Sequence, residues 1–194
     1  TFIWHSQTLF PIIQGGINKE ERLKCLDQML PFATCGLAIG GLSVGEKKDP
    51  MFDIVNILGT HMPKDQPRYL MGVGKPVDIV KSILSGIDMF DCVLPTRNAR
   101  NGQIFTHEGS INILNSKYKD DTSPIDKKSS IVFAQEHSKS YLRHLFKVNE
   151  MFGIRIATLM NIAYYFDLIT EIKSEINNNS FVKWSENYLK RYDR

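Results

Sequence analysis

Four short apolar runs alternate with segments of helical character over the first half of the chain, and this alternation constrains the fold most. Each run ends in glycines or a carboxylate, and each intervening segment carries apolar residues at helical spacing. The runs are residues 9–13, 37–39, 69–71 and 87–93. Parallel neighbours need a crossover, which a helix usually supplies, and strands buried on both faces are almost wholly apolar. The pattern therefore predicts an α/β fold with a parallel sheet and four βα units.

The helices of this half have recognisable start and stop signals. Asn18 is an expected N-cap with Glu21 at the third helical position, and Pro76 and Gly86 fit the first turn and the end of another helix. A further helix is expected from Pro50 to about Leu58. The first helix should turn four apolar side chains inward: Leu23, Leu26, Leu30 and Phe32.

The carboxyl ends of the four predicted strands carry a distinctive set of residues. Parallel strands place these ends at one edge, where ligands bind in both open α/β sheets and closed barrels. The residues there are Gln14-Gly15-Gly16, Gly40-Gly41, Met71-Gly72 and Asp91. An amide, an apolar cover, a carboxylate and glycines that admit a ligand to the backbone predict a small pocket for a planar polar ligand.

The fourth strand runs into Asp91, after which Pro95 is expected to open a loop that carries Arg97 and Arg100. A carboxylate at the buried end of a strand must be hydrogen-bonded or ion-paired. Asp91 is therefore either structural, as a cap or an arginine partner, or a nucleophile toward a sugar anomeric carbon.

The pattern also allows two interpretations of the two arginines. They are either solvated loop charges or phosphate ligands, since guanidinium groups suit bidentate phosphate contact. Residues 97–119 form a local basic patch, with Arg97, Arg100, Lys117 and Lys119 against one acidic residue, Glu108.

The second half of the chain has a different pattern. Residues 103–106 and 110–113 predict a β-hairpin, and residues 114–128 are polar and rich in turn formers. Helical spacing dominates residues 138–176, with Gly153 as the expected point of division, and a last helix is expected at 180–192.

Composition excludes several classes of protein. The chain of 194 residues is 42% hydrophobic and 23% charged, with a net charge of +3, which is ordinary for a globular protein. No apolar run is long enough to cross a membrane, and residues 1–5 lack a basic leader or a cleavage site, so a cytoplasmic location is expected. The three cysteines have no metal-like spacing.

Several motifs in order along the chain resemble those of the tRNA-guanine transglycosylases, also called queuine tRNA-ribosyltransferases. They are IQGG at 13–16, GGLSVGE at 40–46, YLMGVG at 69–74, DMFDCVLPTRNARNGQ at 88–103 and SKSYLRHL at 138–145. The resemblance covers almost the whole chain. It implies the C-terminal half of a TIM (β/α)8 barrel, with a hairpin insertion and a helical C-terminal region.

The resemblance also implies a reaction. Such enzymes exchange guanine at the wobble position of a tRNA with a GUN anticodon for a queuosine precursor base, and they act as cytoplasmic homodimers. By position, Asp91 would attack ribose C1′ and hold the tRNA covalently, while Arg97 and Arg100 would bind tRNA. Val44 favours the bacterial-type base 7-aminomethyl-7-deazaguanine (preQ1). The implied base-pocket residues are Gln14, Gly41, Leu42, Met71 and Gly72.

Two departures from the family pattern qualify these expectations. An eight-stranded barrel usually needs about 250 residues, and the family's N-terminal half, with its acid/base aspartates, has no counterpart here. The family also holds a structural zinc on three cysteines and a histidine, whose positions here are Ser129, Ile131, Ala134 and Met160. A hydroxyl, two hydrocarbons and a thioether do not make a zinc site, so no zinc is expected.

The expected organisation is a partial barrel over residues 1–113, with the catalytic strand and the tRNA-binding loop, and a degenerate zinc region with C-terminal helices over 114–194. The chain alone should be inactive. Two other readings remain: a noncatalytic tRNA-binding or dimer-partner subunit, and a decaying gene remnant.

Overall fold

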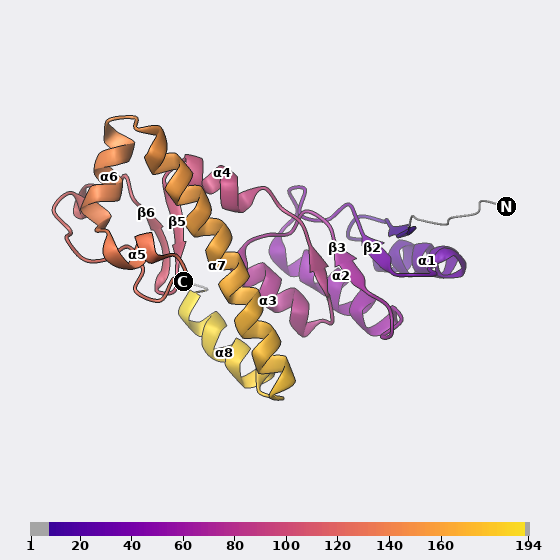
Figure 1. The fold of residues 1–194 in the computed structure, drawn as a ribbon. Coiled ribbons are helices and arrows are strands. Elements are labelled where there is room, and N and C mark those ends of the chain that lie inside the picture. The colour runs from indigo at the N-terminus through magenta and orange to yellow at the C-terminus, as the bar shows by residue number, and fades with distance from the viewer. Residues whose placement is uncertain (1–7, 193–194) are drawn as a thin grey trace. The chain divides into compact units, whose positions relative to one another are not determined.

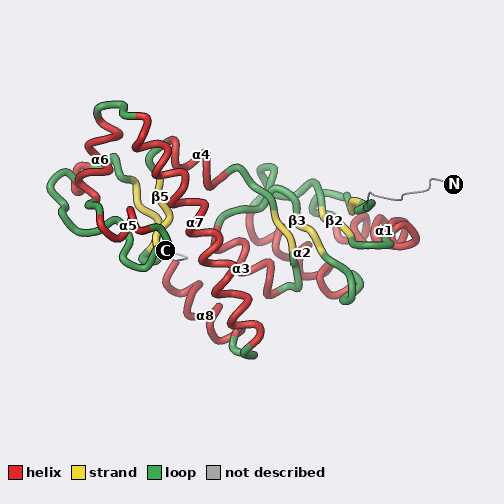
Figure 2. The backbone as a smooth tube through the Cα atoms, in the orientation of Figure 1, coloured by secondary structure: helices red, strands yellow, loops and turns green. Residues whose placement is uncertain are grey.

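The computed structural model describes residues 8–192, and the chain divides into two compact units, residues 1–92 and 93–194. Figures 1 and 2 show strands and helices in each unit. Residues 1–5, on which the expectation about a leader rested, lie outside the described part of the chain.

The first unit contains a parallel sheet whose strands follow one another in chain order, as the alternating pattern predicted. Its strands are β1 (Ile12–Ile13), β2 (Leu37–Ile39), β3 (Arg68–Leu70) and β4 (Met89–Phe90). The register aligns Ile13 with Ile39 and Leu70 with Phe90. The strands are short, as Figure 2 shows in yellow, and their parallel pairing brings their carboxyl ends to one edge.

Three helices connect these strands: α1 (Lys19–Met29), α2 (Lys48–His61) and α3 (Pro76–Leu84). The predicted apolar face of α2 is confirmed, because Met51, Ile54, Val55 and Leu58 are all buried. The predicted helix end at Gly86 is confirmed by its φ of 86°, a left-handed conformation that glycine adopts without strain.

Two expectations about burial in this unit are wrong. The strands are not all buried on both faces: β2 is fully buried, whereas Ile12 in β1 is 39% exposed and Met89 in β4 is 44% exposed. These two strands are the edges of the described sheet. In α1, only Leu26 of the four expected residues is buried: Leu23 is partly exposed within the helix, and Leu30 and Phe32 are exposed in a 3-10 turn, Leu30–Phe32, that follows the helix end at Met29.

In its described part, residues 93–192, the second unit combines a hairpin with five α-helices and a short 3-10 helix, Ser116–Tyr118. The hairpin strands are β5 (Gln103–Thr106) and β6 (Gly109–Asn112), which pair antiparallel as predicted. The helices are α4 (Leu94–Arg100), α5 (Val132–Glu136), α6 (Lys139–Lys147), α7 (Met151–Asn177) and α8 (Phe181–Tyr192). The hairpin thus belongs by packing to the second unit. A functional division after residue 113 stays a prediction.

The division of the long helical segment differs from the expected one at Gly153. The chain breaks before α7, where Asn149 has a φ of 57° and Glu150 caps the helix by accepting from the N–H of Phe152. Gly153 lies inside α7 and allows α6 to approach. A Cβ on Gly153 would lie 2.8 Å from the Cβ of Leu145.

No helix among residues 8–192 is both long and apolar enough to cross a membrane.

Candidate active site and arginine helix

The carboxyl ends of the parallel strands meet at one edge of the first unit, where two pairs of predicted site residues come together. Gln14 follows β1 and lies against Gly41, which follows β2: a Cβ on Gly41 would lie 2.6 Å from Oε1 of Gln14. Gly72 follows β3 and donates its N–H to Oδ1 of Asp91, after β4, at 2.9 Å. Both glycines have positive φ, 61° and 73°, so a side chain at either would strain the backbone.

The remaining two predicted pocket residues lie at the same edge in different environments. Leu42 is only 3% exposed and packs in the hydrophobic core of the first unit. Met71 is partly exposed, and its N–H donates to the carbonyl of Ile39 at 3.1 Å, which continues the hydrogen bonding between β2 and β3.

Asp91 is an exposed carboxylate held by two hydrogen-bond donors. The hydroxyl of Tyr69 donates to Oδ1 at 2.7 Å, and the Gly72 N–H donates to the same oxygen. The Tyr69 hydrogen bond, followed by that from Gly72, holds the pKa of Asp91 below its usual range. The same bond raises the pKa of Tyr69 and keeps it protonated as the donor. The predicted hydrogen bonding is confirmed, but the expected burial is wrong, because β4 is an edge strand.

Arg22 in α1 is fully buried and donates hydrogen bonds to four backbone carbonyls at the end of β1 and in the loops after β1 and β2. Its Nη1 donates to Ile13 and Gly40, both at 2.7 Å, Nε to Gly16 at 2.8 Å, and Nη2 to Gly41 at 3.2 Å. The fork of guanidinium donors thereby ties the loop after β1 to the loop after β2. Burial lowers the pKa of Arg22, while nearby Cys25 and Glu46 act in the opposite direction.

Arg22 is not among the residues that the sequence pattern singles out. It lies four residues before the buried Leu26 and therefore on the same helical face. The sequence signal that could have identified Arg22 was a charged residue on the buried face of an otherwise ordinary helix.

The loop after Gly41 is organised by Glu46. The carboxylate of Glu46 accepts from the N–H of Val44 at 2.9 Å and also from the N–H of Ser43. Although some desolvation raises it, these backbone donors lower the pKa of Glu46 overall. Val44 itself is 81% exposed, so its side chain is available for contact with a ligand.

Arg97 and Arg100 lie on helix α4 and not on the loop expected from the sequence. Pro95 lies in the first turn, where its restricted φ favours a helix and its missing N–H costs nothing. Both arginines are exposed and three residues apart, so they share one side of the helix, whereas Ala99 is fully buried. Lys117 and Lys119, the other cations of the predicted patch, are exposed on either side of the buried Tyr118.

The four residues expected from the resemblance at the positions of zinc ligands lie in a largely apolar environment. Ala134 and Met160 are 0% and 2% exposed and belong to the core of the second unit, and Ile131 packs against that core. Ser129 is buried, and its hydroxyl accepts from the N–H of Ile131. This donor set does not fit zinc. The described residues also contain no cluster of three or more histidine, cysteine or acidic side chains suited to a metal.

Comparison with known proteins supports the family resemblance. The chain matches the family described as Queuine tRNA-ribosyltransferase over residues 3–194. It is similar to queuine tRNA-ribosyltransferases of Treponema denticola (41% identity over 98% of this chain) and Francisella tularensis subsp. novicida (47% over 95%). These matches cover 52% and 50% of the two relatives, so the chain spans about half the length of the curated relatives it matches. With a family match over nearly its whole length, the chain belongs to the queuine tRNA-ribosyltransferase family.

Proposed function

We propose that this chain supplies the nucleophile and part of the base pocket of a tRNA-guanine transglycosylase. The observation that carries this proposal is the ionised, exposed Asp91, held at a strand end by Tyr69 and Gly72. Its substrates would be a tRNA with a GUN anticodon and the base preQ1.

The proposed reaction has two displacements at ribose C1′. In the first, a carboxylate oxygen of Asp91 bonds to C1′ while the C1′–N9 bond breaks, and guanine leaves with the bonding electrons and accepts a proton. In the second, a ring nitrogen of preQ1 attacks C1′, loses its proton and displaces the carboxylate. Because Tyr69 and Gly72 both bind Oδ1, we assign Oδ2 as the attacking atom. The groups that transfer these protons would lie in the half of the relatives that this chain does not match.

The base would occupy the edge formed by Gln14, Gly41, Leu42, Met71 and Gly72. The contact between Gln14 and Gly41 supports this assignment, because it places an amide beside a backbone that a flat ligand can approach. The exposed Val44 supports preQ1 as the incoming base through the resemblance to the bacterial pattern.

Arg97 and Arg100 would bind tRNA phosphates near the anticodon. Their exposure on one side of α4 supports this role, because both guanidinium groups can reach one strand of RNA. A tRNA substrate agrees with the cytoplasmic location expected from the sequence.

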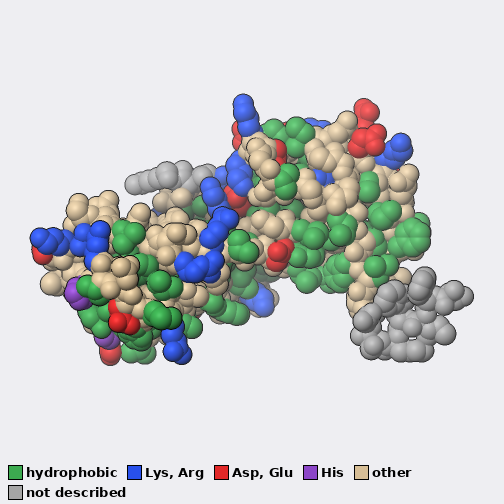
Figure 3. Space-filling model, turned by 90° about the horizontal axis from the view of Figure 1, so that it is seen from above, with side chains coloured by type: hydrophobic (Ala, Val, Ile, Leu, Met, Phe, Trp, Pro, Cys, Tyr) green, Lys and Arg blue, Asp and Glu red, His purple; other side chains and the backbone are tan. Residues whose placement is uncertain are grey.

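We further propose that the parallel sheet is part of a TIM barrel, with a functional boundary after residue 113. The sequential strand order β1-β2-β3-β4 supports a barrel, in which neighbouring strands follow one another along the chain. We also propose a homodimer and a C-terminal unit without zinc. Exposed apolar side chains support a partner surface, among them Phe166 at 70% and Met151 at 81% exposure; such side chains are green in Figure 3.

Exchange of labelled guanine into tRNA tests the reaction. It should be measured for this chain alone and for a longer polypeptide that contains it, each with Asp91 and with Asp91→Asn. We expect no exchange by the chain alone and Asp91-dependent exchange by the longer form. Exchange by Asp91→Asn at the wild-type rate would remove the nucleophile assignment. Tight tRNA binding without exchange in every form would instead favour a noncatalytic tRNA-binding or dimer-partner subunit.

A further inference from the structure

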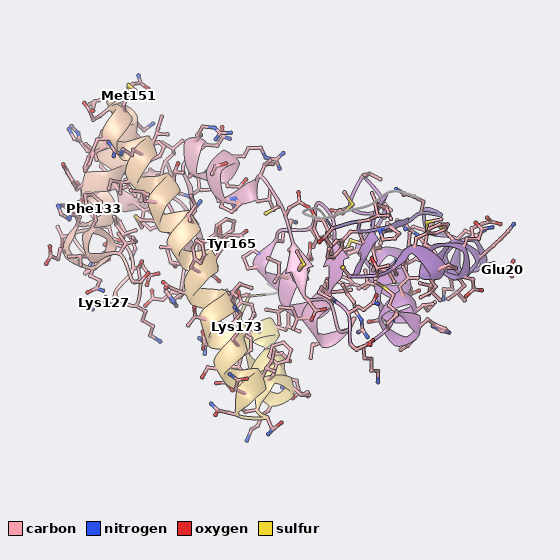
Figure 4. The ribbon with its side chains drawn as sticks, turned by 45° about the vertical axis from the view of Figure 1, so that its right-hand side comes forward. Glu20, Lys127, Phe133, Met151, Tyr165 and Lys173 are labelled. Atoms are coloured by element: carbon pink, nitrogen blue, oxygen red, sulfur yellow. The ribbon has the colours of Figure 1, made fainter. Side chains whose placement is uncertain are left out.

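Asn161, in the middle of α7, is a fully buried amide whose hydrogen bonds reach two other elements of the second unit. Its Oδ1 accepts from the N–H of Phe105, and its Nδ2 donates to the carbonyls of Gln103 and Pro95, all at 2.9 Å. One neighbouring donor and two neighbouring acceptors leave only one sensible orientation of the amide. Met151 and Lys173 mark two points along α7 in Figure 4.

These three bonds hold the arginine helix at its beginning and the hairpin strand that follows its end. Pro95 lies in the first turn of α4, two residues before Arg97 and five before Arg100. Gln103 and Phe105 belong to β5. The chain from Pro95 to Gln103 is therefore held at both ends by one side chain, with both arginines in between.

Packing reinforces the same connection. Ala99, on the buried side of α4, and Met160, the residue before Asn161, belong to one hydrophobic core and are 0% and 2% exposed. Apolar contact alone tolerates sliding and rotation of a short helix, whereas three directed hydrogen bonds favour one position. A buried amide that satisfies three partners is thus suited to fixing the direction of α4.

We propose that Asn161 is a positioning residue for RNA binding, which holds α4 so that Arg97 and Arg100 present their guanidinium groups together. This inference rests on the proposed role of the two arginines in binding tRNA. Asn161 is buried and does not touch the RNA itself. Its removal would weaken binding because two long side chains on an unfixed helix lose more conformational entropy when they bind phosphates.

The test uses the whole chain and an RNA stem-loop with a GUN anticodon, with affinity measured at several salt concentrations. The informative variant is Asn161→Asp, which has almost the same shape and keeps the acceptor for Phe105. It replaces the donor with an oxygen that faces the carbonyls of Pro95 and Gln103. The double variant Arg97→Ala/Arg100→Ala, and the triple variant that adds Asn161→Asp to it, complete a double-mutant cycle.

We expect Asn161→Asp to weaken RNA binding about tenfold, as a misplaced pair of phosphate ligands should. Arg97→Ala/Arg100→Ala should make RNA affinity less dependent on salt concentration, by the equivalent of between one and two released counterions. In that background Asn161→Asp should cause no further loss of affinity, although it should lower the unfolding temperature equally in both backgrounds. A residue that only stabilises the fold would not show this difference between the two readouts.

Two further variants control for destabilisation. Ile172→Ala removes a buried side chain of α7 eleven residues from Asn161 and should lower stability while leaving RNA affinity unchanged below its unfolding temperature. If Asn161→Asp does not fold, Asn161→Ser serves in its place, because its hydroxyl retains one donor and one acceptor; it should show a smaller loss of affinity that also disappears without the arginines.

The outcomes separate the two proposals. The positioning role of Asn161 alone is overturned if the Asn161 variant weakens RNA binding equally with and without the arginines. It is also overturned if the Asn161 variant leaves RNA binding unchanged although loss of the arginines weakens it. Unchanged affinity and salt dependence in Arg97→Ala/Arg100→Ala overturns the proposed function of the arginines, and the positioning role with it.

Discussion

The hydroxyl of Tyr69 donates a 2.7 Å hydrogen bond to Oδ1 of Asp91, linking the side chains of two neighbouring parallel strands. Tyr69 pairs with Met89 in the sheet, two residues before Asp91. The bond therefore crosses from the middle of β3 to the end of β4. It favours the ionised carboxylate, which is the form a nucleophile needs.

Replacement of Tyr69 by Phe should raise the pKa of Asp91, because the first of the bonds that lower it is lost while the Gly72 N–H remains. Carboxyl ¹³C chemical shifts followed through an acid titration measure this directly. Tyr141→Phe, a substitution in the second unit, is the matched control and should leave the Asp91 titration unchanged. Identical titration curves for Tyr69→Phe and the wild type would contradict the assigned role of the hydrogen bond.

Asp91→Asn should abolish guanine exchange in any form of the protein that shows it, by at least about 10³-fold, since an amide does not form the covalent intermediate. RNA affinity should stay within about twofold, because Asp91 is not proposed to bind phosphate. Single-turnover exchange and equilibrium binding measured on the same preparation distinguish these effects. A parallel loss of affinity would indicate that the substitution disturbs the fold or the RNA site.

The parallel sheet could be predicted from the sequence because the patterns that indicate it are local and recur along the chain. Apolar runs with helical segments between them determine a parallel arrangement, and Asn18 and Gly86 mark helix ends by their own backbone preferences. The strand ends could be assigned to one edge for the same reason. Motif resemblance then added chemical roles that spacing alone left open.

Other features depend on tertiary contacts that no local pattern reports. Arg22 is buried because four carbonyls, at the end of β1 and in the loops after β1 and β2, converge on its guanidinium group. The arginine segment is helical because Pro95 fits a first helical turn as well as a loop, and packing of Ala99 favours the helix. Asn161 was missed because its three partners lie 56 to 66 residues away.

Arg22→Met should destabilise the first unit by about 3 kcal/mol, because it leaves several buried carbonyls without donors. Arg22→Lys should cost less, since an ammonium can still donate to some of these carbonyls. Lys24→Met, at an exposed position of the same helix, should stay within about 0.5 kcal/mol of the wild type. Urea unfolding followed by circular dichroism tests all three; equal stabilities of Arg22→Met and Lys24→Met would contradict the account.

Metal removal should leave the second unit unchanged. Because Ala134 and Met160 pack in the core where ligands would be needed, a strong chelator should not shift the unfolding temperature, and added Zn²⁺ should not raise it. Met160→Ala should cost about 2–5 kcal/mol, as expected for a buried methionine. Metal analysis that finds one tightly bound zinc per chain would contradict the assignment of these positions to apolar packing.

The pair formed by half-buried His107 and buried Asp126 should make the stability of the second unit depend on pH. His107 Nδ1 lies 2.8 Å from Oδ2 of Asp126, and this hydrogen bond raises the pKa of His107 although burial lowers it. Burial raises the pKa of Asp126, but the hydrogen bonds from His107 and Lys128 lower it overall.

The direction of each pH effect follows from the linkage between proton binding and folding. Stability from His107 is fully present below its unfolded pKa, about 6.5, and is lost as pH rises through the higher folded pKa. Stability from Asp126 is present above its unfolded pKa, about 3.9, and is lost as pH falls through the lower folded pKa. The contribution of the pair should therefore be largest between about pH 4 and 6.5. Urea unfolding of the wild type and His107→Gln across this range should give curves that differ most within the window and converge at higher pH; a constant difference up to pH 9 would contradict the ion pair.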